Sequence, residues 1–173
     1  MIVLKGLDAN GRSPYQHHPW PLPEGDAPGA WVEAGLRPIE LCANGIHGCL
    51  PEQVGSLPGD RWFVAEIEGD VVSGTDKAAG RRGRLLREIP PEEIQRFALA
   101  CASRAMRHAS GALELAGLHA LAESLRPHWR LRNRAAAKTA AWAAKVAAGA
   151  AARAAEKQWQ GRWITKHWIR EAR

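Results

Sequence analysis

The sequence predicts an α+β protein in which a small β-rich N-terminal domain, residues 1–90, precedes a helical C-terminal region, residues 91–173. Two observations support this fold class. Up to about residue 90, glycines and prolines separate short apolar or alternating runs, a pattern typical of strands and turns. Further along, apolar residues recur at helical spacing, and 14 of the 21 residues from 135 to 155 are alanine, the strongest helix former.

Three short runs predict the main strands. They are MIVLKGL at residues 1–7, RWFVAEIEGDVV at 61–72 with a turn at Gly69-Asp70, and GRLLREI at 83–89.

Between the first two strands, residues 13–31 contain five prolines, too many for a helix or a central strand. This stretch is expected to form an ordered surface loop that Tyr15, Trp20 and Trp31 pin to the core.

The stretch LCANGIHGC, residues 41–49, is expected to form a β-hairpin, because Asn-Gly is the strongest signal for a two-residue loop. Such a hairpin pairs Cys42 with His47 and Glu40 with Cys49, and alternation puts these four side chains on one face. The two cysteines would then be diagonal neighbours, about 7–8 Å apart between Cα atoms. That separation disfavours a disulfide between them.

A helix is expected to begin at Pro90-Pro91, because proline is tolerated in the first turn and the next two residues, both glutamates, complement the helix dipole. It is expected to end at Ser110-Gly111. A second helix over residues 112–125 and a third over roughly 130–157 should follow, with Gly161 separating the third from a short terminal helix.

Charge is distributed unevenly along the chain, whose net charge is +6. Residues 1–125 contain 12 Lys and Arg against 16 Asp and Glu, giving −4, whereas residues 126–173 contain 12 against 2, giving +10. We call residues 126–173 the basic tail. Concentrated positive charge indicates a polyanionic partner such as nucleic acid, an anionic membrane surface or an acidic protein surface, and it does not choose among them. The candidate anion-binding residues are Arg130, Arg132, Arg134, Lys138, Trp142, Lys145, Arg153 and Lys157.

Two other interpretations of the basic tail stay open. It would equally form a solvated helix that packs on the rest of the protein, or dock on the acidic residues Glu66, Glu68 and Asp70 of the predicted 61–72 strand. These carboxylates alternate on one face, which usually means the wet side of a half-buried sheet.

The sequence has no apolar run that supports a signal peptide or a membrane span, so a cytoplasmic protein is expected. Three cysteines are few and odd in number, which favours reduced thiols over a disulfide framework.

The N-terminal half resembles a known group of proteins. SPYQHHPWPLPEGDAPGAWVEA, LCANGIHGC, AEIEGDVV and DKAAGRRGRLLREI occur in that order. Together they resemble a family of small actinobacterial and phage-associated hypothetical proteins with a Cys-x-x-Gly-[Ile/Val/Leu/Phe]-His-x-Cys hairpin. The resemblance covers about residues 3–90 and implies a domain, without a reaction. It leaves the basic tail unexplained.

The hairpin also suggests a metal site. Cys42, His47 and Cys49 are zinc-ligand types, but a closed site needs a fourth ligand, and the Cys-x-x-Cys spacing that marks zinc sites is missing. His17, His18 and Glu40 are candidates for the fourth ligand. Packing of the cysteines as small hydrophobic residues is favoured over metal binding.

A pocket between His47 and the proline-rich loop is the alternative functional site. Its residues resemble, at the level of fold, the ADP-ribosyltransferase architecture, in which Tyr or His side chains hold the nicotinamide of NAD and a late Glu bonds the ribose. That resemblance implies Tyr15, His17 and His47 as holders and Glu88 as the carboxylate.

The function expected from the sequence is that of a non-enzymatic binding or adaptor protein whose basic C-terminal helix engages nucleic acid or an acidic partner. A small NAD-using enzyme of ADP-ribosyltransferase type is the alternative. A structural protein that forms a homo-oligomer through its helices is the third class.

Overall fold

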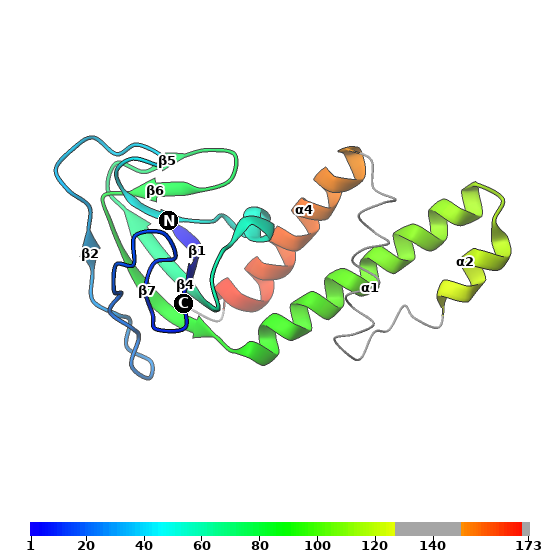
Figure 1. Cartoon of the computed structure of the whole chain (residues 1–173), viewed down its shortest axis with the longest axis horizontal. Helices are drawn as coiled ribbons and strands as arrows, with labels where there is room; N and C mark the ends of the chain where they lie inside the picture. The colour runs from blue at the N-terminus through cyan, green and yellow to red at the C-terminus, as the bar shows by residue number, and fades with distance from the viewer. Residues whose placement is uncertain (127–149, 171–173) are drawn as a thin grey trace. The chain divides into compact units, whose positions relative to one another are not determined.

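The computed structural model describes residues 1–126 and 150–170, and it confirms the α+β class. Antiparallel sheets occupy the N-terminal part and helices the C-terminal part (Figure 1). The chain divides into two compact units: unit 1 comprises Met1–Ile89 together with Glu156–Arg173, and unit 2 comprises Pro90–Ala155. The end of the chain therefore belongs to the same unit as the sheets.

The main sheet of unit 1 has four antiparallel strands in the order β1-β4-β7-β2. Its strands are β1 (Ile2–Leu7), β4 (Arg61–Glu68), β7 (Arg82–Ile89) and β2 (Val32–Glu33). The three long strands match those that the sequence predicts. A bulge interrupts the β4–β7 pairing, because Val64 pairs with Arg87 and Ala65 with Leu85.

A smaller antiparallel sheet has the order β3-β6-β5. Its strands are β3 (Ile46–Gly48), β6 (Ala78–Gly80) and β5 (Val72–Ser73). Leu4 of β1 and Cys49 exchange two backbone hydrogen bonds, of 2.7 and 2.8 Å, which tie this sheet to the main one. A 3₁₀ helix, η1 (Pro51–Ser56), follows Cys49.

The core of unit 1 lies on one face of the main sheet. Alternation along β4 puts Phe63, Ala65 and Ile67 on this face, and all three are almost fully buried. The same core cluster includes Val3, Leu7, Trp20, Ala78 and Leu85.

The opposite face of the main sheet carries Trp62, and the end of the chain packs there. Helix α4 (Ala150–Ile164) continues into a π-helical turn, η3 (Thr165–Ile169), and Figure 1 draws its C-terminal end beside the sheet. Trp168 is fully buried, and its ring centroid lies 6.2 Å from that of Trp62 in an edge-on arrangement. Arg87 of β7 donates a 2.9 Å hydrogen bond to the carbonyl oxygen of Trp168.

Gly161 does not separate two helices, so that prediction is wrong. Helix α4 runs through it, and its small size permits a close approach to η1. A Cβ at Gly161 would lie 3.1 Å from the Cβ of Glu52 and 3.2 Å from the Glu52 backbone nitrogen. The glycine is therefore used for packing and not as a helix stop.

In unit 2, the predicted helix end at Ser110-Gly111 is also wrong. Helix α1 (Pro91–Leu115) starts where the sequence predicts but continues through both residues. The Ser110 hydroxyl is buried and donates a 3.1 Å hydrogen bond to the carbonyl oxygen of Ala122 in α2 (His119–Leu125). The chain turns instead at Gly117, whose φ of +76° suits glycine.

The predicted third helix lies largely outside the described residues. From Ala150 onward the backbone is helical, as predicted. The candidate anion-binding residues Arg130, Arg132, Arg134, Lys138, Trp142 and Lys145 fall in the part that is not described, and so does the side chain of Arg153.

The two-residue hairpin at Asn44-Gly45 does not form. Instead, Glu40 and Asn44 close a tight turn, and β3 pairs with β6. The Asn44 side chain donates to the carbonyl oxygens of Gly35, Arg37 and Pro38, which holds Asn44 outside a hairpin loop. Cys42, with φ of +67°, adopts the left-handed conformation in this turn.

Candidate functional site

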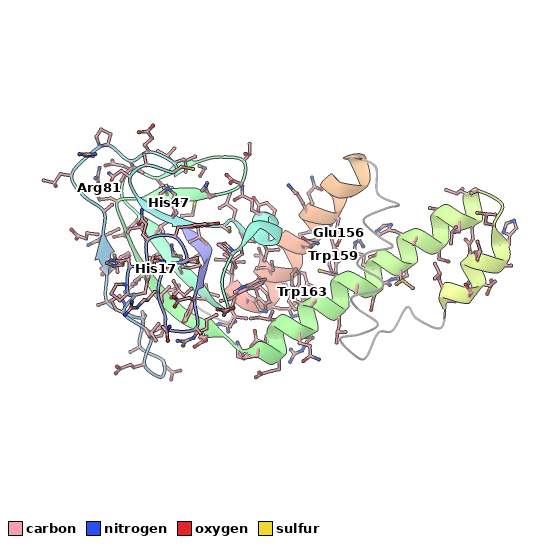
Figure 2. The ribbon with its side chains drawn as sticks, in the orientation of Figure 1. His17, His47, Arg81, Glu156, Trp159 and Trp163 are labelled. Atoms are coloured by element: carbon pink, nitrogen blue, oxygen red, sulfur yellow. The ribbon has the colours of Figure 1, made fainter. Side chains whose placement is uncertain are left out.

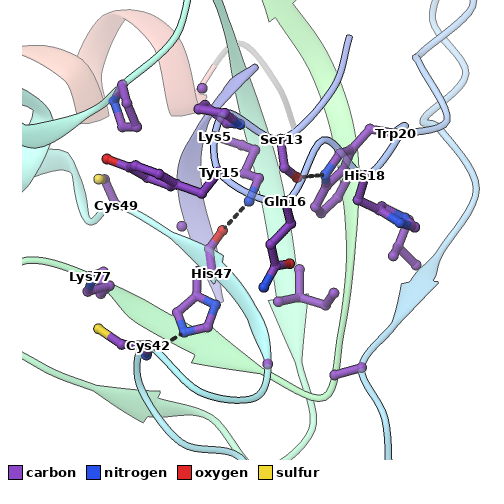
Figure 3. A pocket seen from close by; sticks show the side chains of 18 of the residues that line it. Lys5, Ser13, Tyr15, Gln16, His18, Trp20, Cys42, His47, Cys49 and Lys77 are labelled. Carbon is purple, nitrogen blue, oxygen red and sulfur yellow. Dashed lines mark hydrogen bonds between the residues drawn. The ribbon is translucent and has the colours of Figure 1, made fainter. Parts of the chain in front are cut away.

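A pocket of about 570 Å³ opens between the proline-rich loop, β1 and the turn that precedes β3. Figure 3 shows its side chains. We call it the Lys5 pocket, and the lining residues that matter below are Lys5, Ser13, Tyr15, His47, Cys49 and Lys77.

The loop that covers this pocket is held in part by Trp20. Its indole is buried and donates a 2.9 Å hydrogen bond to the Ser13 hydroxyl. Trp31 is half-buried and stacks with Arg82 and Arg84, at 4.6 Å from each guanidinium to the ring centroid. Tyr15 is 84% exposed, so the expectation that it pins the loop to the core is wrong.

Lys5 occupies an unusual position for a lysine. Alternation along β1 puts it on the core face, between the fully buried Val3 and Leu7. Its ammonium donates a 2.9 Å hydrogen bond to the carbonyl oxygen of His47 and lies 4.8 Å above the Trp20 ring (Figure 3). Burial lowers the pKa of Lys5 from 10.5 to about 8. Among the described residues, no carboxylate forms an ion pair with it.

His47 is held as a neutral ring. Its Nε2 accepts a 3.0 Å hydrogen bond from the backbone N–H of Cys42, so the ring proton resides on Nδ1. Burial and the nearby charge of Lys5 lower the pKa of His47. The ring is thereby fixed in one tautomer and orientation.

The two cysteines beside His47 differ from each other. Both are free thiols, Cys42 exposed and Cys49 buried. Burial and the charge of Asp76 raise the pKa of the Cys49 thiol, which keeps it protonated and inert. Lys77 lies near Cys42, and their hydrogen bond raises the pKa of Lys77.

The residues named for an ADP-ribosyltransferase site are only partly brought together. His47 and Tyr15 line the Lys5 pocket, whereas His17 and Glu88 are not among its lining residues. Figure 2 labels His17 and His47. Glu88 accepts a 2.7 Å hydrogen bond from Arg61 at the sheet.

No group of three or more His, Cys, Asp or Glu side chains suited to a metal ion occurs within residues 1–126 and 150–170. Cys42 and His47 are in contact, but the contact is a hydrogen bond from the Cys42 backbone N–H to His47 Nε2. This ring nitrogen is therefore already used as an acceptor.

Residues 157–170 of the basic tail, which the structure describes, form a second candidate site. Arg162, Lys166 and Arg170 follow one another at intervals of four residues, and all three are exposed. We call these three residues the cationic stripe. Residues 157–170 contain no Asp or Glu, and none of the stripe residues forms an ion pair with a carboxylate in the described part of the chain.

The acidic residues proposed to dock the basic tail pair with arginines in or directly beside the sheets. Glu66 pairs with Arg84 at 2.9 Å, Glu68 pairs with Arg82, and Asp70 pairs with Arg81 at 3.2 Å. The guanidinium groups beside these carboxylates come from β7 and the residue before it, and not from the described part of the tail.

Lys5 is the residue that the sequence analysis missed. The signal was present in the first strand, where the Val3-x-Lys5-x-Leu7 alternation puts a charge among core residues.

Three comparisons with known proteins bear on these sites: no family model, no curated protein and no solved structure matches this chain. The proposed family resemblance of residues 3–90 therefore stays a prediction. Within the described residues, no helix combines the length and apolar character that crossing a bilayer requires.

Proposed function

We propose that this protein is a nucleic-acid-binding module, in which the cationic stripe of the C-terminal helix neutralises backbone phosphates. The observation that supports it is the exposure of three cations on a segment that is anchored by buried apolar side chains, of which Trp168 packs against Trp62 of the sheet. Trp168 and Ile164 are fully buried, while Arg162, Lys166 and Arg170 are exposed.

Anchoring favours binding, because cations on a fixed helix lose less conformational freedom on contact with phosphates than cations on a free chain. The chain's own carboxylates also compete less with phosphates for the stripe cations, since the acidic residues of β4 already pair with arginines of β7. The exposed Lys157 adds a further cation on the same helix.

The test uses the full-length chain with a duplex DNA and a single-stranded RNA oligonucleotide, measured by fluorescence anisotropy over a range of salt concentrations. The triple variant Arg162→Gln/Lys166→Gln/Arg170→Gln should lower the slope of log K against log salt by about 2–3, because each phosphate contact contributes about 0.7–0.9. A matched variant, Arg12→Gln/Arg37→Gln/Arg107→Gln, removes the same charge from exposed positions elsewhere.

Equal loss in the two variants would contradict the proposal, and so would an absence of binding by the wild-type chain. Tighter, stripe-dependent binding to polyglutamate than to either oligonucleotide would instead indicate an acidic protein partner.

The NAD-using alternative stays a prediction. Two of its four named residues line the Lys5 pocket, but its carboxylate, Glu88, does not. Stabilisation of the chain against heat by NAD, lost in His47→Ala, would favour that alternative.

A further inference from the structure

The Lys5 pocket holds a cation that lacks a matching negative charge. Lys5 lies on the core face of β1, and its ammonium contacts a carbonyl oxygen and an aromatic ring. Both contacts are weaker than an ion pair with a carboxylate, because neither brings a full negative charge to the desolvated ammonium.

None of the charged or titratable groups that line the pocket forms an ion pair with Lys5 in the described part of the chain. Lys77 forms an ion pair with Asp76 at 3.6 Å, and Glu33 lines the same pocket without an ion pair to Lys5. His47 is near Lys5 but is held as a neutral ring by Cys42. Within the described residues, no carboxylate of the pocket therefore forms an ion pair with Lys5.

The pocket also has the size and polar groups of a ligand site. Its volume of about 570 Å³ falls in the range of small-molecule sites, roughly 300–1,000 Å³. Gln16 and Ser13 line it as further hydrogen-bonding side chains (Figure 3). Tyr15, largely exposed beside the pocket, provides an aromatic surface that a ligand would cover.

We propose that the Lys5 pocket binds a small organic anion, a carboxylate or a phosphate ester, whose charged group pairs with the Lys5 ammonium while its apolar part lies against Tyr15. A ligand of this kind supplies the ion-pair partner that Lys5 does not have among the described carboxylates. This site is separate from the cationic stripe and does not depend on the proposed nucleic-acid binding.

The test uses the full-length chain in the background of the triple stripe variant, so that phosphate cannot report on the stripe. Inorganic phosphate and acetate are the probes, with sodium chloride at matched ionic strength as the reference. Lysine-labelled NMR should show the Lys5 pKa rising from about 8 toward 10.5 with at least one probe. A response to phosphate alone indicates a phosphate ester, and a response to acetate alone indicates a carboxylate.

Lys5→Met should weaken binding of the active probe by roughly tenfold or more, the effect of losing one hydrogen bond to a charged group. Lys77→Met, which removes the other pocket lysine, should retain more of the affinity. A Lys5 pKa that moves with neither probe overturns the proposal, and so does equal affinity in Lys5→Met and the parent. Neither result would affect the oligonucleotide test of the stripe.

Discussion

Lys5 is a case in which one residue lowers the stability of the fold that holds it. Because its pKa is lowered from 10.5 to about 8, the folded chain binds fewer protons than the unfolded chain between these pH values. The cost of the buried charge is complete below pH 8 and is relieved as the pH rises toward 10.5.

Lys5→Met is therefore expected to stabilise the protein at pH 7. The pKa difference corresponds to roughly 3 kcal/mol, and solvent screening of the partly exposed side chain lowers the expected gain to about 2 kcal/mol. Guanidinium unfolding at a series of pH values measures the effect, and the gain should shrink between pH 8 and pH 10.5. Lys77→Met is the control. The Lys77 pKa is raised, so its contribution is present at low pH and lost as the pH rises through that value. A gain from Lys5→Met that does not vary with pH would contradict the assignment.

The two cysteines beside His47 are expected to differ in reactivity. Cys42 is exposed, whereas Cys49 is buried and has a raised pKa, so an alkylating reagent should modify Cys42 first in the folded chain. Mass spectrometry of peptides after brief treatment with iodoacetamide measures the order. Faster labelling of Cys49 would contradict the assignment of Cys42 as the exposed thiol and Cys49 as the buried one.

At the scale of an element, helix α4 packs closely on η1 through Gly161, the residue at which the sequence predicts a break between two helices. Alanine in a helix interior is about 1 kcal/mol more favourable than glycine. At Gly161 this gain is opposed, because the added methyl would press on the Glu52 backbone at 3.2 Å. At Gly111 in α1 no described atom lies within 4 Å of such a methyl.

Comparing Gly161→Ala with Gly111→Ala separates the effect of helix propensity from the effect of packing against η1. Gly111→Ala is expected to stabilise the chain by about 0.5–1 kcal/mol. Gly161→Ala is expected to destabilise it by about 1–2 kcal/mol, since the helix must move away from η1. Unfolding in guanidinium, followed by far-UV circular dichroism, compares them. Equal stabilisation by both variants would mean that α4 does not pack closely on η1.

The elements that could be predicted from sequence are those determined by local pattern. The strands β1, β4 and β7 follow from their alternation, and the start of α1 follows from Pro90 and the acidic residues after it. The turn around Asn44 could not be predicted, because its conformation depends on carbonyl groups of residues 35–38 that the Asn44 side chain bonds. The role of Gly161 could not be predicted for the same reason, since it comes from a contact with η1, more than 100 residues away along the chain.

The sequence predicts a pocket beside His47, but it does not predict the charged residue inside that pocket. His47 and the loop above it were expected to form a pocket from their polar residues. Lys5, which supplies the charge, is not identified by the strand pattern of β1, because alternation predicts the strand and not the pocket beside it. Glu88 could not be placed from sequence, since its position depends on the pairing with Arg61 across the sheet.

At the scale of the whole molecule, unit 1 is built from both ends of the chain. Residues 1–89 supply the sheets, and residues 156–170 supply the helix end whose Trp168 packs against Trp62. The sheet residue Arg87 also bonds the Trp168 carbonyl. The β-rich part is therefore not expected to keep its full stability without the C-terminal end.

This dependence predicts that Trp168→Ala destabilises unit 1 by about 3–5 kcal/mol, the usual cost of deleting a large buried aromatic side chain. Lys166→Ala, an exposed change two residues away, should alter stability by less than about 0.5 kcal/mol. Guanidinium unfolding followed by tryptophan fluorescence compares the two. Equal stability of the two variants would show that the helix end does not contribute to the fold, and would also remove the anchoring on which the cationic stripe depends. If Trp168→Ala does destabilise unit 1, a chain shortened to remove the basic tail would lose oligonucleotide binding through loss of structure alone. Charge-neutralising variants of the intact chain are then required to attribute binding to the cations.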